Sequence, residues 1–343
     1  MPNSKTYRTP FLLLLLLLVV CFGINISLGS VSIPLEETFN SIFGRTVQKE
    51  SWDYIIWNYR IPKAFTAILV GSGLSLSGLL MQTLFRNPLA GPFVLGISSG
   101  ASLGAAILIM GSSLFAGIFG FNYIGDIALI LASSIGSFLV LLSVVSVASK
   151  VKDTMTLLII GLMFGSITAA IVSVLSYFSD AEKLQQYTYW TFGSIGNLSW
   201  SQLSLLFGII LIGITLSILC MKSLNALLLG ENYARSLGVN IRKNRFIIII
   251  ATGLLAGGIT AFAGPIVFIG LAVPHLTRQI FDTTNHKILV PAVLIYGAII
   301  ILLCDTIAQI PGNAHVIPIN AITSILGAPV VIWLLVRKRK MIF

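Results

Sequence analysis

Ten long apolar runs constrain the fold of this chain more than any other feature of its sequence. A helix that crosses the hydrocarbon core of a bilayer needs roughly 20 mostly apolar residues. Only 9% of the residues are charged, whereas about a quarter are charged in a typical soluble protein. Hydropathy predicts membrane-spanning helices at residues 11–29, 61–83, 93–110, 124–149, 154–177, 201–221, 246–263, 266–281, 288–304 and 319–336.

The apolar runs are continuous, whereas the strands of a membrane barrel are about ten residues long and alternate apolar with polar residues. The sequence thus predicts an all-α, polytopic membrane protein of about ten transmembrane helices, folded as a single domain over residues 1–343. The first run follows Lys5 and Arg8 and has the beginning of a signal peptide, but no clear small-residue cleavage site follows it. We interpret it as a helix that is retained.

The basic residues predict how the chain is oriented in the membrane. With a cytoplasmic N-terminus, most of the 21 Lys and Arg residues lie on the inner side. This bias predicts a multi-pass protein of the cytoplasmic (inner) membrane with both termini in the cytoplasm. It also accounts for the net charge of +10, so the charge does not indicate a nucleic-acid partner. The basic residues left on the outer side are Arg45, Lys49, Arg60, Lys63 and Lys183.

Candidate catalytic and metal-binding residues are sparse. Cys21, Cys220 and Cys304 lie in or beside apolar runs, and the three His residues have no Cys, Asp or Glu neighbours at ligand spacing. We therefore expect no disulfide, no metal and no cofactor in this chain. The phosphate-binding pattern G-x-x-x-x-G-K-[ST] does not occur, so any ATP would be bound by partner subunits.

One short motif leaves a remote enzymatic alternative open. Gly96-Ile97-Ser98-Ser99-Gly100 matches the G-x-S-x-G pattern of serine hydrolases. That pattern is meaningful only on a strand-to-helix turn with an acid and a His to complete the triad. Here the composition predicts the start of a membrane helix, so close helix packing by small residues is the favoured interpretation.

A loosely repeated segment indicates a transporter. Ala90-Gly91-Pro92-Phe93-Val94-Leu95-Gly96 recurs as Ala263-Gly264-Pro265-Ile266-Val267-Phe268-Ile269-Gly270. In the predicted topology the first copy begins a helix at the inner face and the second begins one at the outer face. This is the pattern of an inverted repeat, which is typical of transporters that alternate around a central path, although chance similarity of two short apolar segments is a rival explanation.

The segment 222–245 differs from the other loops because it mixes apolar residues with charges. Short helices broken at Gly230 and Gly238 could present four leucines on one face: Leu224, Leu227, Leu228 and Leu237. The sequence alone leaves two functions open: a helix lying on the inner membrane surface, or a docking element for a cytoplasmic partner.

Motifs spread over nearly the whole chain carry a family resemblance. The first half contains Arg60-Ile61-Pro62-Lys63 and then Arg86-Asn87-Pro88-Leu89-Ala90-Gly91-Pro92 with Leu95-Gly96. The second half contains Leu229-Gly230-Glu231 with Ala234-Arg235 and Leu237-Gly238, and then AGPIVFIGLAVPH at 263–275, which includes Gly264, Pro265, Pro274 and His275. In this order the motifs resemble the FecCD-type permeases of type II ABC importers, which carry iron–siderophores, haem and cobalamin.

The resemblance implies a homodimer in the lipid membrane with a translocation path along the dimer axis. It also implies two cytoplasmic ATPase subunits, which bind ATP, and an extracytoplasmic substrate-binding protein. By analogy, 222–245 is the ATPase-coupling segment, with Leu229, Gly230, Glu231, Ala234, Arg235, Leu237 and Gly238 as its candidate residues. The candidate structural and translocation motif comprises Arg86, Asn87, Pro88, Gly91, Pro92, Gly96, Gly264, Pro265, Pro274 and His275.

The resemblance further implies that Arg60 and Lys63 dock the binding protein. Gln309 occupies the third docking position, in the D-x-x-x-R pattern that begins at Asp305, so one docking charge is missing or moved. The family's E-L-P-x-G reads Val316-Ile317-Pro318-Ile319-Asn320 here, so the sequence loses the family's acid and Gly in the region 309–320, where the resemblance places docking and gating.

We therefore predict a permease subunit without catalysis of its own, working by alternating access. Iron(III)–siderophore is the leading cargo, only because iron chelates are the commonest cargo of the family, with haem and cobalamin as alternatives. A secondary transporter coupled to ions is the alternative from another class, but carriers of that kind place carboxylates deep in their helices, and these apolar runs contain almost none.

Overall fold

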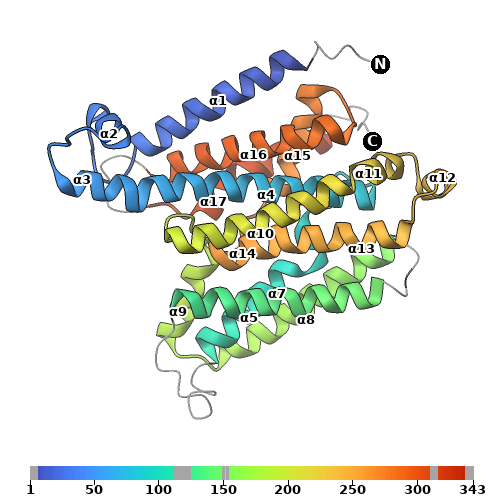
Figure 1. Ribbon diagram of the computed structural model, residues 1–343. Helices are drawn as coiled ribbons and strands as arrows, with labels where there is room; N and C mark the ends of the chain where they lie inside the picture. The colour runs from blue at the N-terminus through green and yellow to red at the C-terminus, as the bar shows by residue number, and fades with distance from the viewer. Residues whose placement is uncertain (1–6, 112–124, 149–150, 152–153, 310–315, 337–343) are drawn as a thin grey trace.

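The structure is a computed structural model that describes residues 7–111, 125–148, 151, 154–309 and 316–336. Its long helices lie side by side in one bundle (Figure 1). Each of the ten predicted membrane segments has a helical counterpart, and the described residues contain no strand. These helices are α1 (Arg8–Ser27), α4 (Ile61–Phe85), α5 (Ile97–Met110), α7 (Asp126–Ala148), α8 (Thr154–Tyr177), α10 (Trp200–Leu219), α13 with α14 (Ile241–Thr252 and Gly258–Ala263, joined by a π turn), α15 (Ile269–Phe281), α16 (His286–Ala308) and α17 (Ile319–Val336).

Shorter helices gather at the two ends of the bundle. At one end, called here the α9 end, lie α2 (Leu35–Ile42), α3 (Glu50–Ile55) and α9 (Ala181–Thr191); at the other, the α12 end, lie α11 (Met221–Leu228) and α12 (Glu231–Ser236) (Figure 1). Helix α1 begins at the α12 end. Seven helices within the described ranges are long and apolar enough to cross a membrane. One of these runs without interruption from Glu50 to Phe85 over 36 residues, about 54 Å at 1.5 Å per residue, so it extends past a hydrocarbon core of about 30 Å.

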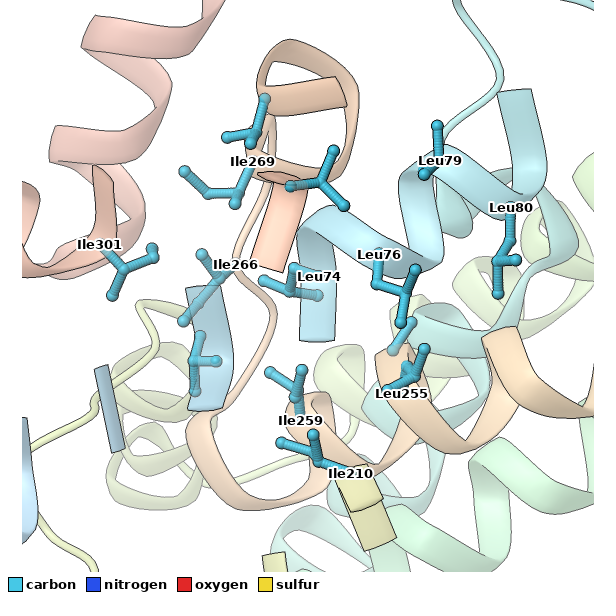
Figure 2. Close-up of a cluster of buried hydrophobic side chains, with 14 of the residues drawn as sticks. Leu74, Leu76, Leu79, Leu80, Ile210, Leu255, Ile259, Ile266, Ile269 and Ile301 are labelled. Atoms are coloured by element: carbon cyan, nitrogen blue, oxygen red, sulfur yellow. The ribbon is translucent and has the colours of Figure 1, made fainter. Parts of the chain in front are cut away.

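Helix α4 forms the centre of the bundle, since it packs against α16, α15, α10 and α13. Most of its side chains are buried, including small and hydroxyl residues as well as leucines. Figure 2 shows Leu74, Leu76, Leu79 and Leu80 of α4 in a cluster of buried aliphatic side chains that also includes Leu255 and Ile259. A helix surrounded by other helices cannot have an apolar stripe on one side only, which is why its sequence is apolar nearly all round.

Two membrane segments are broken, and both breaks fall in the repeated motif. Gly96 has φ 70° directly before α5, Gly264 has φ 73° directly after α14, and Phe268 has φ 68° directly before α15. A left-handed residue ends the helical hydrogen-bond pattern, so α5 and α15 are only 14 and 13 residues long. The predicted segments 93–110 and 266–281 were therefore wrong at their first few residues.

The two short helices run in opposite directions along the bundle (Figure 1), as the predicted inverted repeat requires. The two copies also meet: a Cβ built on Gly270 would lie 2.9 Å from Cδ of Pro92. The repeat therefore brings two interrupted helices together inside the bundle, which is where transporters with this architecture form their path.

Small residues allow the helix backbones to approach closely. A Cβ on Gly104 of α5 would lie 2.0 Å from the carbonyl oxygen of Ala132 in α7, and one on Gly71 of α4 would lie 2.2 Å from that of Gly297 in α16. Such contacts supply van der Waals attraction where lipid removes the hydrophobic drive between helices. Gly165 of α8 makes no such close approach, because a Cβ placed on it would lie 3.5 Å from the Ser99 hydroxyl, at ordinary van der Waals distance.

Candidate functional site

A cavity of about 520 Å³ opens at the α9 end of the bundle. Its wall combines four parts of the chain that are far apart in sequence: the loop after α1, the start of α4, the turn 192–197 and the segment where α16 ends and α17 begins. The charged side chains among the described lining residues are Arg60, Lys63 and Asp305, so two positive charges face one negative charge. The cavity wall therefore carries a net positive charge.

Arg60 closes the end of helix α1. Its Nη1 donates to the carbonyl oxygens of Ile26 and Ser27, both at 2.8 Å, and its Nη2 donates to that of Val31 at 2.5 Å. The last carbonyls of a helix have no partner within the helix, and a cation there also interacts favourably with the helix dipole. The guanidinium is thus held inside the permease and its residue is buried, although it also lines the cavity.

Lys63 and Asp305 form an ion pair one turn further along the same wall. Nζ of Lys63 lies 3.0 Å from Oδ1 of Asp305, and the carboxylate side chain is 3% exposed. Asn25 donates to Oδ2 of the same carboxylate at 2.9 Å, and Gln309 does so at 2.5 Å. A buried carboxylate with three donors is well satisfied, so this cluster joins α1, α4 and α16.

The segment that departs from the family pattern also lines this cavity, through Val316, Ile317, Pro318 and Ile319. Asn320 holds the start of α17 in place: its Oδ1 accepts from the backbone N–H of Val267 at 3.3 Å, and its own N–H donates to the Phe192 carbonyl at 3.3 Å. An Asn at this position therefore connects α17 to the break before α15. His315 lies outside the described residues.

At the α12 end, the segment 222–245 forms two short helices separated by glycines with positive φ. Gly230 (φ 106°) lies between α11 and α12, and Gly238 (φ 80°) lies between α12 and α13, as the sequence predicted. Ala234 is buried, whereas Leu229 and Leu237 are 64% and 59% exposed. Exposed leucines outside the lipid-facing surface of the bundle are typical of a docking site for another protein.

Helix α12 is attached to the bundle by charge. Oε1 of Glu231 accepts from Nη2 of Arg245 in α13 at 3.0 Å, and the same guanidinium donates through Nη1 to the Val151 carbonyl at 3.0 Å. Arg235 lies 3.8 Å from the other carboxylate oxygen of Glu231. Glu231 therefore connects α12 to Arg245 of α13, and Arg245 in turn bonds Val151 between α7 and α8.

The motif Arg86 to Gly96 forms the turn between α4 and α5. Arg86 ends α4 in the left-handed conformation (φ 47°), Asn87 accepts the Leu89 N–H on its side-chain oxygen at 2.9 Å, and the segment Pro92–Leu95 is a 3₁₀ turn. Pro88 and Gly91 belong to this turn as well. In the second copy, Gly264 and Pro265 lie in the break before α15, whereas Pro274 and His275 lie within α15 itself.

Ser98 has a structural partner rather than a catalytic one. It lies in α5, and its Oγ is 3.1 Å from Oγ1 of Thr260 in α14. A nucleophile elbow requires a strand before the serine, and here a 3₁₀ turn precedes it. The hydrolase alternative is therefore wrong.

Sequence reasoning missed a second group of buried polar contacts near the α12 end. Nη1 of Arg278 donates to Oε1 of Gln82 at 2.6 Å, and Nε2 of Gln82 donates to the Leu271 carbonyl at 3.0 Å. His286 bonds Thr83 and Asn225. A polar residue inside an apolar run signals such a contact, but the run does not tell which residue is the partner.

Comparison with known proteins identifies the family. Residues 16–337 match the FecCD transport family. The chain is 36% identical over 329 residues to the vitamin B12 import system permease protein BtuC of Klebsiella pneumoniae, covering 95% of this chain and 93% of that protein. It is 38% identical over 291 residues to the BtuC protein of Salmonella typhi, covering 84% and 85%.

A solved structure described as a metal-chelate type ABC transporter in an inward-facing conformation superimposes with a TM-score of 0.83 at 31% identity, covering 97% of this chain and all of that one. The PsaBC structure from Streptococcus pneumoniae shares the fold only, with a TM-score of 0.55 at 13% identity.

These relatives are membrane-embedded permease subunits of ABC importers, in which ATP is hydrolysed by a separate subunit. The alternative of an ion-coupled carrier is therefore wrong, and the prediction of a non-enzymatic transporter subunit is confirmed. Because the family match and the relatives both extend over most of the sequence, the chain belongs to the FecCD transport family.

Proposed function

We propose that this protein is the permease subunit of a cobalamin importer. Two copies would form the translocation path along their shared axis, two cytoplasmic ATPase subunits would bind ATP and drive alternating access, and an extracytoplasmic binding protein would deliver the cargo. The observation that carries the proposal is the identity of 36–38% to vitamin B12 import permeases over 84–96% of the chain.

The sequence alone favoured iron(III)–siderophore, and the relatives reverse that order. The structural neighbour described as metal-chelate type is consistent with either cargo, since cobalamin is itself a cobalt chelate. Iron chelates and haem are therefore kept as competing cargoes in the test below.

In the proposed orientation the α12 end faces the cytoplasm and both termini lie there. Leu229 and Leu237 are exposed beside the basic and acidic groups of α12, which suits insertion into an apolar groove on an ATPase subunit. Gly230 and Gly238 would set the angle of α12 because their positive φ values are rarely available to other residues.

In the same orientation the α9 end faces the binding protein. The cavity with a net positive wall would receive acidic side chains from that partner, and charge complementarity of this kind guides encounter and orientation. Lys63 is the more accessible of the two docking candidates, because its side chain is 16% exposed, whereas the Arg60 guanidinium already holds three carbonyl groups.

The test is uptake by the reconstituted complex. The permease would be purified with its ATPase subunits, placed in liposomes with the binding protein outside, and supplied with labelled cyanocobalamin, a labelled ferric siderophore or haem. We expect accumulation of cyanocobalamin that needs both ATP and the binding protein, with little uptake of the other two. Uptake of a ferric siderophore or haem in place of cyanocobalamin would refute the proposed cargo.

A further inference from the structure

A chain of buried and partly buried hydrogen bonds joins helix α11 to the junction of α4 and α16. Asn225 of α11 lies beside the first turn of α16, where its Oδ1 is 2.9 Å from the backbone nitrogen of His286 and 2.7 Å from Nδ1 of the same residue. Nε2 of His286 lies 2.9 Å from Oγ1 of Thr83 in α4. His286 is 1% exposed and Thr83 is fully buried, so water does not compete for the bond between them, whereas Asn225 is half-buried.

The donors and acceptors can be assigned along the chain. The backbone N–H of His286 can only donate, so Oδ1 of Asn225 accepts, and Nδ1 of His286 must therefore carry the proton that it shares with the same oxygen. In the neutral ring Nε2 is then an acceptor, and the one Thr83 hydroxyl proton is shared between Nε2 and the Leu79 carbonyl oxygen of its own helix, each 2.9 Å from Oγ1. Nδ2 of Asn225 donates to Oδ1 of Asn285 at 3.1 Å, and that oxygen also caps the Lys287 N–H at 3.0 Å.

This arrangement fixes the position of α11 in a way that apolar packing cannot. Leu224 and Leu227 of α11 are buried against the bundle, but apolar contact is non-directional and permits sliding. Two hydrogen bonds to one amide oxygen fix the distance and angle between α11 and α16, and the His286 ring extends the same restraint to α4. Helix α4 is the centre of the bundle, so a displacement of α11 is passed on to it directly.

We propose that Asn225 and His286 are the positioning residues through which movement of the ATPase-docking segment is transmitted to α4 and α16. The inference rests on the proposed function in one respect: it takes 222–245 as the segment that an ATPase moves. Helix α12 has a different attachment, because the Glu231 side chain in its bond to Arg245 is 30% exposed. The contact at α11 differs because His286 is buried and continues through a buried hydrogen bond to Thr83 of α4. It therefore links the docking segment to the centre of the bundle, as transmission through a two-state element requires.

Three variants separate a positioning role from a merely structural one. Asn225→Leu removes both bonds to His286 while keeping a similar volume. Asn225→Asp keeps an acceptor for both, loses the donor to Asn285 and adds a negative charge beside the His286 N–H donors, so we expect it to retain coupling. Thr83→Val removes the hydroxyl that holds Nε2, and its matched control is Thr215→Val, where an exposed hydroxyl of α10 bonds only the Leu211 carbonyl of its own helix.

The first measurement is cyanocobalamin taken up per ATP hydrolysed by the reconstituted complex. Allosteric coupling energies correspond to factors of about 5 to 150 in the coupled equilibrium. We therefore expect Asn225→Leu and Thr83→Val to lower the ratio of uptake to ATP hydrolysis at least about fivefold. The ATPase subunits should still co-purify with both variants. Thr215→Val and Asn225→Asp should stay close to the parent. Unchanged ratios in both Asn225→Leu and Thr83→Val would overturn the proposal, and if Asn225→Leu fails to assemble, Thr83→Val alone decides.

The second measurement does not depend on the cargo. Ser194 is exposed and lines the cavity at the α9 end, and the three native cysteines are buried, so Ser194→Cys can be labelled selectively with an impermeant maleimide. We expect the labelling rate to change on ATP addition in the parent and in Thr215→Val, but not in Asn225→Leu or Thr83→Val. If the parent takes up no cyanocobalamin, the proposed cargo is wrong. If the labelling rate still depends on ATP in Asn225→Leu and Thr83→Val, the proposed role of these contacts in transmission is wrong.

Discussion

Gly78 is the position at which the structure makes its most quantitative prediction. It lies in α4, opposite Gly270 at the start of α15, where the two broken segments of the repeat come together. A Cβ on Gly78 would lie 1.7 Å from the Gly270 carbonyl oxygen and 2.4 Å from the carbonyl carbon. These neighbours are backbone atoms, so no side-chain rotation can make room for a methyl group.

The effect of Gly78→Ala follows from two opposing terms. Real Cβ contacts essentially never fall under 3.0 Å, so the helices must separate by roughly an ångström or more, and overpacking of this kind destabilises by about 1–3 kcal/mol or more. Replacing Gly by Ala inside a helix contributes about 1 kcal/mol in the opposite direction. Because the contacts are with backbone, we take the overpacking term from the upper end of its range, about 3 kcal/mol. After the helix-propensity gain of about 1 kcal/mol, the net loss is about 2 kcal/mol.

The measurement is thermal unfolding in mild detergent, followed by intrinsic fluorescence, together with ATP-driven uptake. A loss of about 2 kcal/mol lowers the midpoint by roughly 3 °C in a chain of this size, at an unfolding entropy of about 2.1 cal/mol/K per residue. Separation of α4 from α15 should reduce uptake as well. The matched control is Gly208→Ala in α10, where a Cβ would have nothing within 4 Å, so its midpoint should stay the same or rise. Equal midpoints for the two variants would refute the close approach of α4 and α15.

Three further predictions concern the two ends of the bundle. Arg60→Glu combined with Lys63→Glu should weaken docking of the binding protein, most strongly at low salt. The control is Arg45→Glu, since Arg45 is exposed and lies outside the cavity, and it should not weaken docking. If the double variant and the control bind the binding protein with equal affinity at low salt, the cavity is not the docking site. Asp305→Leu should lower thermal stability by about 3 kcal/mol, the low end of the range for a broken buried pair, because it leaves the half-buried Lys63 without its partner. Adding Lys63→Met should restore much of the loss. Gly230→Ala should strain the backbone by about 1–3 kcal/mol, because residue 230 has φ 106°. It should also reduce uptake per ATP hydrolysed. An unchanged ratio of uptake to ATP hydrolysis would contradict the role of the turn between α11 and α12.

Much of the fold could be predicted from hydropathy, because lipid forces the backbone of each crossing to form helix. The errors lie where an apolar run continues through a break. The composition of Ile266 to Gly270 does not indicate that Phe268 has a positive φ. The predicted helix 266–281 therefore began before the observed start of α15. By contrast, Gly230 and Gly238 interrupt a polar segment, and there the glycines alone indicated both helix ends.

The short helices at the α9 end were not predicted for the opposite reason. Helices α2, α3 and α9 are 8, 6 and 11 residues long, too short to cross a membrane and too polar to appear in a hydropathy profile. Tertiary contact holds them, as in the hydrogen bond from the Ser41 hydroxyl of α2 to the Asp53 carboxylate of α3 at 2.5 Å. Sequence spacing does not contain that information.

Arg60 shows why the roles of site residues are harder to predict than their positions. A charge near a predicted helix end is equally compatible with docking, with snorkelling to the interface and with an internal contact. In the structure the guanidinium satisfies carbonyls that α1 and the following loop leave without partners, and this use does not exclude an electrostatic effect on a partner in the same cavity.

The two roles separate in Arg60→Lys, which keeps the positive charge but loses the planar fork. That variant should keep salt-dependent docking while lowering thermal stability, because one ammonium cannot reach all three carbonyl groups. If Arg60→Lys instead weakens docking as much as Arg60→Glu does at unchanged stability, the guanidinium contacts the partner directly and its bonds to α1 are of little consequence.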